Sequence, residues 1–345
     1  MTRWIGSLTS VCLVLALVAT APCAGAASVV TDAAGRAVTV PDRVARVIPA
    51  GPPAAALLYT LAPQTMLGWP HAPDAASRAV MTPEAAALPE LGPLVRDGIV
   101  DEALVRRLNP DLILDVGTVS PRYVEEAKRV QAATGVPYLL LDGRLEETAG
   151  VYRLLGPVLG ESERGEGLAA AAERILAETR NAVAKGATAK PPLRAYYGRG
   201  RDGLTTAGPQ SVNGEVLSLL GLDNVAGGTG ATGLVKTNAD QLRSWNPDVV
   251  LTLDQAFAES LRRDPAWAGL GAVTSGRVLV APQLLFGSID EPPGVNRLLG
   301  LRWGAHALYP EASSAPFAEK LRAFYLEFYG IDLDDAELDH LLATR

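Results

Sequence analysis

The chain of 345 residues has few of the side chains on which most enzymes rely. It contains two cysteines, Cys12 and Cys23, and three histidines, His71, His306 and His340. The sequence has no P-loop, no G-x-S-x-G nucleophile elbow and no H-E-x-x-H zinc motif. We therefore expect a binding protein without catalytic residues, resident metal or cofactor.

Basic residues are also scarce. There are 31 Lys and Arg against 38 Asp and Glu, which gives a formal net charge of −7, and no basic tract occurs. Proteins that bind nucleic acid usually carry such a tract, so nucleic acid is not an expected partner. With 48% hydrophobic and 20% charged residues, the composition is that of a globular protein.

Only the N-terminus has a long apolar run. Arg3 precedes a run from Ile5 to Ala21, and the small residues AGAA follow. This order predicts a secretory signal peptide over residues 1–27, and the run is short for a membrane helix. Both cysteines would be removed with it, although Cys23 is a candidate lipid anchor, disfavoured by Pro22 directly before it. We expect a soluble, monomeric protein in the periplasm.

One turn occurs twice. Asn109-Pro110-Asp111 opens an apolar run at 112–114, and Asn246-Pro247-Asp248 opens another at 249–251. Proline cannot continue a helix and favours an extended conformation in the asparagine before it. Each copy therefore predicts a helix, a tight turn and a buried strand. Their recurrence predicts two similar lobes with a ligand-binding cleft between them.

Strand-like and helical patterns alternate on both sides of a long helical segment. Apolar runs predict strands at 44–48, near 66–69, and at 112–116, 137–141, 193–197, 249–253 and 277–281. Such alternation predicts an α/β fold with a mostly parallel sheet in each lobe. The expected lobes are residues 28–159 and 188–345, joined by a helix within 160–187 for which Glu161 to Lys185 has the composition. Aromatic residues at helical spacing from Phe317 to Tyr329 predict a terminal helix on the second lobe.

Four stretches, over roughly residues 44–310, resemble the periplasmic substrate-binding proteins of ABC importers for iron-siderophore complexes, vitamin B12 and related metal-containing solutes. They are RVIPAGPPAAALLYTLAP, LPELG leading to NPDLIL, YYGRGRDGLTT and DEPPGVNRLLGLRW. The resemblance implies two Rossmann-like α/β lobes bridged by one long helix, the class III build, with the ligand between the lobes. The chain departs from the related proteins at Ser288, where they usually have tryptophan. This difference favours a smaller ligand.

The stretch YYGRGRDG contains the strongest site candidates. Gly198 and Gly200 allow the backbone to turn around Arg199, whose guanidinium suits a carboxylate or an oxyanion. We expect Tyr197, Arg199 and Arg201 to contact the ligand. Further candidates lie in loops after predicted strands, with the centre of the site expected near Gly117 and Asp254; they are Trp69, Arg96, Gly117, Thr118, Phe286 and Ser288, and then Gly51 to Pro53, His71, Arg144, Thr205, Lys236 and Asp254.

The sequence favours a non-catalytic periplasmic protein that captures an iron-siderophore or related metal complex for an ABC importer. Its partners would be a permease dimer and the cytoplasmic ATPase. The resemblance implies docking through one acidic residue on each lobe, and Glu125 and Glu259 are the nominated pair. Two alternatives remain: the same fold binding an oxyanion such as molybdate or tungstate, and a periplasmic enzyme, for which no nucleophile and base pattern occurs.

Overall fold

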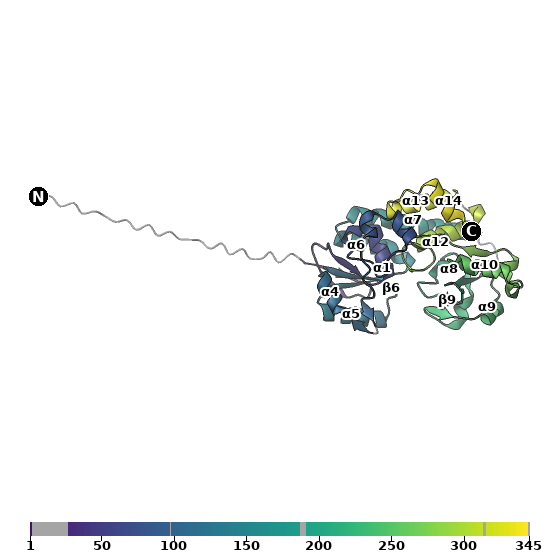
Figure 1. The fold of residues 1–345 in the computed structure, drawn as a ribbon, viewed down its shortest axis with the longest axis horizontal. Helices are drawn as coiled ribbons and strands as arrows, with labels where there is room; N and C mark the ends of the chain where they lie inside the picture. Colours follow the sequence, from purple (N-terminus) through teal and green to yellow (C-terminus); the bar gives the residue numbers. More distant parts are fainter. Residues whose placement is uncertain (2–26, 97, 187–190, 313–314, 344–345) are drawn as a thin grey trace.

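The computed structural model describes residues 1, 27–96, 98–186, 191–312 and 315–343 (Figure 1). The predicted signal peptide lies outside these residues except for Met1 and Ala27. Within them, no helix has both the length and the apolar composition needed to cross a membrane.

The first lobe is built on a parallel sheet in the order β3-β6-β7, with β6 in the centre. Its strands are β3 (Val47–Pro49), β6 (Leu112–Gly117) and β7 (Tyr138–Asp142), with hairpins β1 (Ala27–Thr31) to β2 (Ala37–Pro41) and β4 (Val95–Arg96) to β5 (Ile99–Val100). Its helices are α1 (Pro52–Leu61), α2 (Ala75–Val80), α3 (Pro83–Ala86), α4 (Glu102–Leu108), α5 (Pro121–Thr134) and α6 (Thr148–Val158), with 3-10 turns η1 (Pro63–Thr65) and η2 (Leu145–Glu147).

The second lobe has a parallel sheet in the order β10-β8-β12-β13. Its strands are β8 (Arg194–Gly198), β10 (Asp223–Asn224), β12 (Val249–Thr252) and β13 (Val278–Val280), with antiparallel pairs β9 (Thr205–Ala207) to β11 (Leu234–Lys236) and β14 (Gln283–Leu284) to β15 (Phe286–Gly287). Its helices are α8 (Glu215–Leu219), α9 (Ala239–Trp245), α10 (Gln255–Arg263), α11 (Gly271–Thr274), α12 (Arg297–Leu308), α13 (Phe317–Tyr329) and α14 (Asp335–Ala343), with 3-10 turns η3 (Val225–Thr229), η4 (Pro265–Trp267) and η5 (Pro310–Ala312).

The two sheets repeat each other. In each lobe the strand after the Asn-Pro-Asp turn, β6 or β12, lies between the first strand of the parallel sheet, β3 or β8, and the strand that follows it in the chain, β7 or β13. Both neighbours pair with it in parallel. The prediction of two α/β lobes with parallel sheets is therefore confirmed.

The aspartate of the repeated turn accepts backbone hydrogen bonds from the neighbouring segment in both lobes. Asp111 Oδ2 accepts from the N–H of Ala45 at 2.8 Å and from that of Arg46 at 2.9 Å, and Asp248 Oδ2 accepts from the N–H of Arg194 at 2.8 Å. Each aspartate thus fastens the start of the neighbouring strand. The expectation of an extended asparagine is wrong, because Asn109 and Asn246 both have φ 42° and end their helices in the left-handed conformation. Asparagine tolerates that conformation better than most residues.

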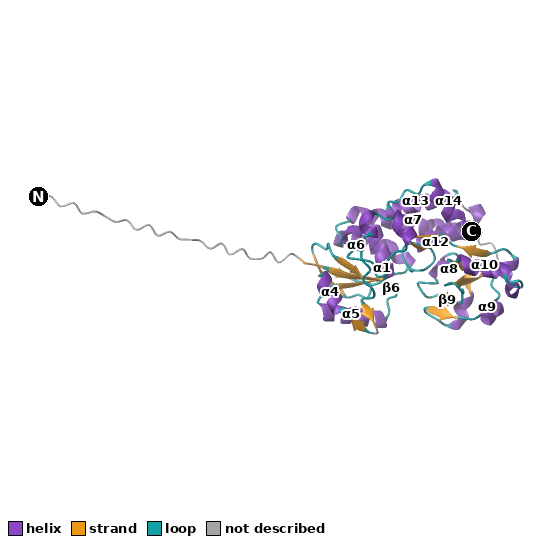
Figure 2. Cartoon of the chain, viewed as in Figure 1, coloured by secondary structure: helices purple, strands orange, loops and turns teal. Residues whose placement is uncertain are grey.

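Helix α7 (Ser162–Gly186) joins the lobes and matches the predicted long helix to within one residue at each end. It packs on α1 and α6 of the first lobe and on α12 of the second, and Figure 2 shows these helices gathered on one side of the two sheets. Helix α13 has the predicted bounds. It contacts α12, as expected of a helix on the second lobe, and also α1 and α7. The lobes are therefore joined by more than the bridging helix.

A buried polar junction also connects the lobes. The guanidinium of Arg297, which is 2% exposed, pairs with Glu215 Oε2 at 2.9 Å and donates to the carbonyl of Gly143. Glu215 also accepts from the backbone N–H of Leu145 at 3.0 Å. Gly143 and Leu145 belong to the first lobe and Glu215 and Arg297 to the second. Together with the shared apolar core that runs through both lobes, this junction resists their separation.

Two predicted strands differ from the structure. The run at 44–48 becomes the short strand β3, because it starts only where the backbone reaches β6. The segment near 66–69 makes only isolated bridges, Val47 with Met66 and Trp69 with Glu90. The N-terminal hairpin β1-β2 was not predicted; its alternating exposed and buried residues are a short-range signal for it.

Candidate ligand-binding site

A cleft of about 580 Å³ lies between the lobes, and both lobes line it. In the first lobe the lining follows the end of β3 and the segment after Met66; in the second it follows the end of β8 and the loop before α12. The lining residues are Pro52, Pro53, Ala55, Trp69, Pro70, His71, Ala72, Pro73, Asp74, Ser77, Arg199, Leu285, Phe286, Glu291, Pro292 and Pro293. Ligands of parallel α/β sheets bind at the carboxyl ends of strands, which is where this cleft lies.

Aromatic side chains form the apolar part of the cleft. Trp69 is only 1% exposed, and its indole N–H donates to the carbonyl of Ala85 at 2.9 Å. Its ring meets Tyr59 edge-on, with 5.5 Å between centroids, and contacts the ring of Phe286, with 6.3 Å between centroids. Because Trp69 is fixed by packing and a hydrogen bond, it forms an almost fully buried base beneath the partly exposed ring of Phe286.

The charged part of the cleft comes from the second lobe. Arg199 Nε donates to Asp290 Oδ2 at 3.0 Å and lies 3.2 Å from Glu291 Oε1. The Asp290 carboxylate is completely buried and also accepts from Asn213 Nδ2 at 2.9 Å and from the N–H of Glu291 at 2.7 Å. The guanidinium of Arg199 is therefore held by two carboxylates.

Burial and neighbouring charges shift the pKa values at this cluster. Burial raises the pKa of Glu291, Arg199 lowers it, and Asp290 and Asp254 raise it further, so that the net direction is upward. Burial also raises the pKa of Tyr197 well above its usual value, and the carboxylates of Asp290 and Glu291 add to this shift. Tyr197 is thus neutral, and Glu291 protonates more readily than an exposed glutamate.

The loop that carries the acidic pair has an unusual backbone. Leu285 has φ 67° and Glu291 has φ 64°, although neither is glycine. Side chains with a Cβ rarely adopt this left-handed region, and such residues gather at ligand sites, where the surrounding structure holds them. Both residues line the cleft.

A second depression, of about 380 Å³, adjoins the cleft in the second lobe. It shares Glu291 with the cleft and adds Arg201 and Asp254. Asp254 Oδ1 accepts from the N–H of Phe257 at 3.0 Å and so caps α10. Gly117 and Asp254 were the two expected centres of the site, and of these Asp254 lies close to the cleft.

The structure brings together four of the predicted contact residues and places the others elsewhere. Trp69, Arg199 and Phe286 line the cleft, and Arg201 lines the adjoining depression. Tyr197 lies in the core beneath Arg199, and Ser288 is also completely buried, with its carbonyl against Gly300. Arg96, Gly117 and Thr118 do not line the cleft. Gly117 packs closely on Gly143: a Cβ added to Gly143 would lie 2.8 Å from the Cα of Gly117.

The weaker candidates divide in the same way. Pro52, Pro53 and His71 line the cleft, whereas Gly51, Arg144, Thr205 and Lys236 do not. The residues that the sequence reasoning missed are Asp290, Glu291 and the two prolines after them. The letters DEPP gave no sign of this role, because acidic residues are ordinary in a solvated loop and an unpaired carboxylate becomes costly only when it is buried.

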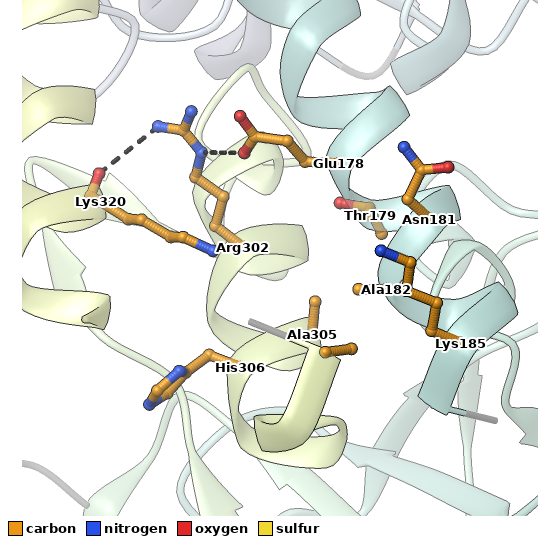
Figure 3. A pocket seen from close by; sticks show the side chains of 10 residues that line it. Glu178, Thr179, Asn181, Ala182, Lys185, Arg302, Ala305, His306 and Lys320 are labelled. Carbon is orange, nitrogen blue, oxygen red and sulfur yellow. Dashed lines mark hydrogen bonds and ion pairs between the residues drawn. The ribbon is translucent and has the colours of Figure 1, made fainter. Parts of the chain in front are cut away.

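A cavity of about 190 Å³ between α7 and α12 is a different kind of feature (Figure 3). Arg302 Nε pairs with Glu178 Oε2 at 3.4 Å, and its Nη1 donates to the carbonyl of Lys320 at 3.5 Å. Burial lowers the pKa of Arg302, and the Glu178 carboxylate acts in the opposite direction. No predicted contact residue lines this cavity, and the first lobe contributes nothing to it.

The described side chains contain no group of three or more His, Cys, Asp and Glu placed to hold a bare metal ion. The cleft instead offers aromatic and proline surfaces beside a hydrogen-bonded ion cluster. This arrangement suits a small molecule with apolar surface.

The fold is shared with known solute-binding proteins. An ABC transporter solute-binding protein from Sulfurospirillum deleyianum superposes with a TM-score of 0.79 at 24% identity, covering 91% of this chain and 99% of that one. The molybdate-binding protein MolA of Haemophilus influenzae gives 0.71 at 19% identity, covering 89% and 99%. The Helicobacter pylori protein CeuE with nickel(II) bound gives 0.68 at 17% identity, covering 91% and 99%. At these identities the likeness shows the fold.

A search of curated protein sequences found no match to this chain. The family model described as periplasmic binding protein matches residues 102–284, which is more than half of the chain. That range contains both Asn-Pro-Asp turns, the bridging helix and Arg199. The chain belongs to the periplasmic binding protein family and has its two-lobed class III fold.

Proposed function

We propose that this protein is the periplasmic solute-binding component of an ABC importer and that it captures a metal complex, an iron-siderophore or a related chelate, in the cleft between its lobes. The observation that carries the proposal is the cleft itself. Its volume of about 580 Å³ falls within the range of sites for small organic molecules, and both lobes line it. A protein that only buried a structural interface would not leave such a space between two rigid walls.

The lining favours a ligand with an organic periphery. Trp69 and Phe286 face the cleft beside several prolines, which give apolar surface without any hydrogen-bond donor. A metal enclosed by an organic chelator presents such a surface. The molybdate bound by the neighbouring structure is a small polar ion, and this cleft is large and apolar for an ion of that kind.

The proposed cellular setting follows from the family. The signal peptide expected over residues 1–27 would export the chain, and a permease dimer with its ATPase would receive the solute. Glu125 and Glu259 remain the proposed docking pair. Each is the fifth residue of the helix that follows the central strand of its lobe, α5 or α10, and each side chain is exposed, by 71% and 40%.

The ligand is tested with the mature protein against ferric hydroxamate and catecholate complexes, haem, cobalamin, nickel complexes, molybdate and tungstate. We expect one chelate class to raise the melting temperature, because a ligand at 100 times its Kd adds about 2.7 kcal/mol of stability. It should also change the fluorescence of Trp69. The variant Trp69→Phe should lose most of that signal and Trp267→Phe, outside the cleft, should keep it. The transport proposal fails if no solute binds and the protein turns one over instead.

The docking pair is tested separately. The double variant Glu125→Gln/Glu259→Gln should leave ligand affinity unchanged and reduce uptake through the reconstituted importer. Glu102→Gln, which removes an exposed carboxylate of α4, is the matched control. Normal uptake by the double variant would remove these two residues from the docking surface.

A further inference from the structure

The cleft contains an ion cluster with more negative than positive charge. Among the described residues that line it, Arg199 is the one permanent cation, and it faces the carboxylates of Asp290 and Glu291. Asp290 is fixed beneath the surface by Asn213 and is fully buried. Arg199 is thus paired with two carboxylates, and those that line the cleft or lie directly beneath it outnumber its single positive charge.

The opposite wall adds a second negative charge. Asp74 lines the cleft from the first lobe, and its Oδ1 accepts from the N–H of Ser77 at 2.7 Å, which keeps it in place as the cap of α2. His71, on the same wall, is 70% exposed and has Glu90 as its acidic neighbour at 3.8 Å. An incoming anion therefore meets the carboxylates of Asp74 and Glu291 and a guanidinium that is already paired.

Glu291 is the more exposed of the two carboxylates that pair with Arg199. Its side chain is 36% exposed and belongs to both the cleft and the adjoining depression, whereas the Asp290 side chain has no exposed surface. A ligand that approached Arg199 would have to displace Glu291 or bind beside it. The glutamate thus competes with any acidic group of a ligand for the same guanidinium.

We propose, on the basis of the function proposed above, that the cleft selects metal complexes without net negative charge and that Glu291 sets this preference by occupying Arg199. The apolar walls bind the organic periphery of the complex, and the excess carboxylate charge attracts neutral or cationic complexes over anionic ones. Glu291 is therefore a specificity-determining residue rather than a simple surface acid.

The test uses one linear ferric trihydroxamate whose terminal group is varied: a free amine gives net charge +1, an acetylated amine 0 and a succinylated amine −1. A ferric tris-catecholate of net charge −3 completes the series. Binding is followed by quenching of tryptophan fluorescence. We expect the wild-type protein to bind the +1 and 0 complexes about tenfold or more tightly than the −1 complex, because the added negative charge is repelled by Glu291 and Asp74 and competes with Glu291 for Arg199.

The variant Glu291→Gln keeps the shape of the side chain and removes its charge. It should reduce the difference between the +1 and −1 complexes to less than about threefold, mainly by tightening the −1 complex. Asp74→Asn, which retains a capping side chain, should shift the preference in the same direction by a smaller factor. Glu102→Gln, remote from the cleft, should leave the series unchanged. The melting temperature of each variant checks that it is folded.

The outcomes distinguish the charge preference from the transport function. Equal affinity of the wild-type protein for the +1 and −1 complexes, or tight binding of the tris-catecholate alone, would overturn the charge preference while supporting capture of a metal complex. An unchanged preference in both Glu291→Gln and Asp74→Asn would overturn the role of these carboxylates. Failure of all four complexes, with none of the wider panel binding, would overturn the proposed function and this inference together.

Discussion

In the first lobe the cleft is lined by Trp69 and four prolines, with Asp74 as the one acid. The second lobe also supplies apolar residues, among them Phe286 and two prolines, but adds Arg199 and Glu291 above the buried Asp290. At the opposite ends of the same strands, the two lobes are alike. There each Asn-Pro-Asp turn ends a helix and fastens the neighbouring strand through its aspartate. The lobes therefore share the turn that builds the sheet and differ at the rim that meets the ligand.

This difference follows from what each end of a strand must do. At the entry end, a buried strand needs its backbone hydrogen bonds satisfied, and an aspartate at a fixed position meets that need in both lobes. At the exit end, the chain leaves as a surface loop, where side chains are free to serve binding. The aromatic and proline side chains supply contact area, and Arg199 with its neighbouring carboxylates supplies discrimination between ligands of different charge.

The largest effect is expected where the two lobes meet. Arg297→Met leaves Glu215 buried without its cation and should lower the free energy of unfolding by about 3–5 kcal/mol, measured by chemical denaturation. The double variant Arg297→Met/Glu215→Leu should lose less, because no unpaired charge remains. Arg106→Met, which breaks an exposed pair with Glu102, is the control and should cost less than about 1 kcal/mol. Equal losses of unfolding free energy in Arg297→Met and Arg106→Met would mean that the junction does not hold the lobes together.

The shared turn can be compared directly. Asp111→Ala removes two backbone hydrogen bonds and Asp248→Ala removes one, so we expect losses of about 2 and about 1 kcal/mol of unfolding free energy. Thermal or chemical denaturation measures both. Asp240→Ala, at a 92% exposed side chain of α9, should be close to neutral. If only one of the two variants lost stability, the two turns would share their geometry but contribute differently to the free energy of unfolding.

The apolar contribution of the rim is tested at Phe286. Phe286→Ala removes a ring that faces Trp69 and should weaken binding of the identified ligand about tenfold, or about 1.4 kcal/mol. Leu326→Ala, at a residue that is 54% exposed on α13, should leave the affinity unchanged. An unaffected Kd in Phe286→Ala would exclude this ring from the surface that binds the ligand.

The smallest effect is expected from pH. Because burial raises the pKa of Glu291 above its ordinary value, this carboxylate becomes neutral at a higher pH than an exposed glutamate. As the pH falls from about 7 towards 5, the −1 trihydroxamate should therefore gain affinity relative to the 0 complex, by a few-fold. The groups that face Glu291 are Arg199, Asp290 and Asp254, with Asp74 and His71 on the wall across the cleft. If the relative affinity still changes with pH in Glu291→Gln, the effect belongs to another of these titratable groups.

Local patterns in the sequence predicted much of the fold. Helix α7 and helix α13 were predicted with nearly their observed bounds, because their composition and spacing are local properties of the chain. The central strands were found for the same reason, since each follows a proline turn and is continuously apolar. The strand near 66–69 was overpredicted, because its residues make only isolated bridges while Met66 and Leu67 pack into the cores of the lobe and Trp69 lines the cleft.

The site was predicted only in part, and the missing part is long-range. Arg199 was identified from its glycine-flanked turn, but its partner Asp290 is 91 residues away in the sequence. Without that pairing, a free arginine predicted an anionic ligand. Tyr197 and Ser288 were placed in the site by their neighbours in the sequence, whereas both side chains are completely buried. Which side of a loop meets the cleft depends on packing between the lobes.

The bridging helix has a consequence for how the chain folds. Two lobes with the same strand order in one chain are at risk of exchanging strands while both are incomplete, as similar domains in tandem do. The backbone hydrogen bonds of helix α7 close within its own 25 residues, and the helix lies between β7 and β8 in the sequence. It therefore separates the last strand of the first sheet from the first strand of the second by a rigid spacer. We expect this spacer to favour pairing within each sheet over exchange of strands between the lobes.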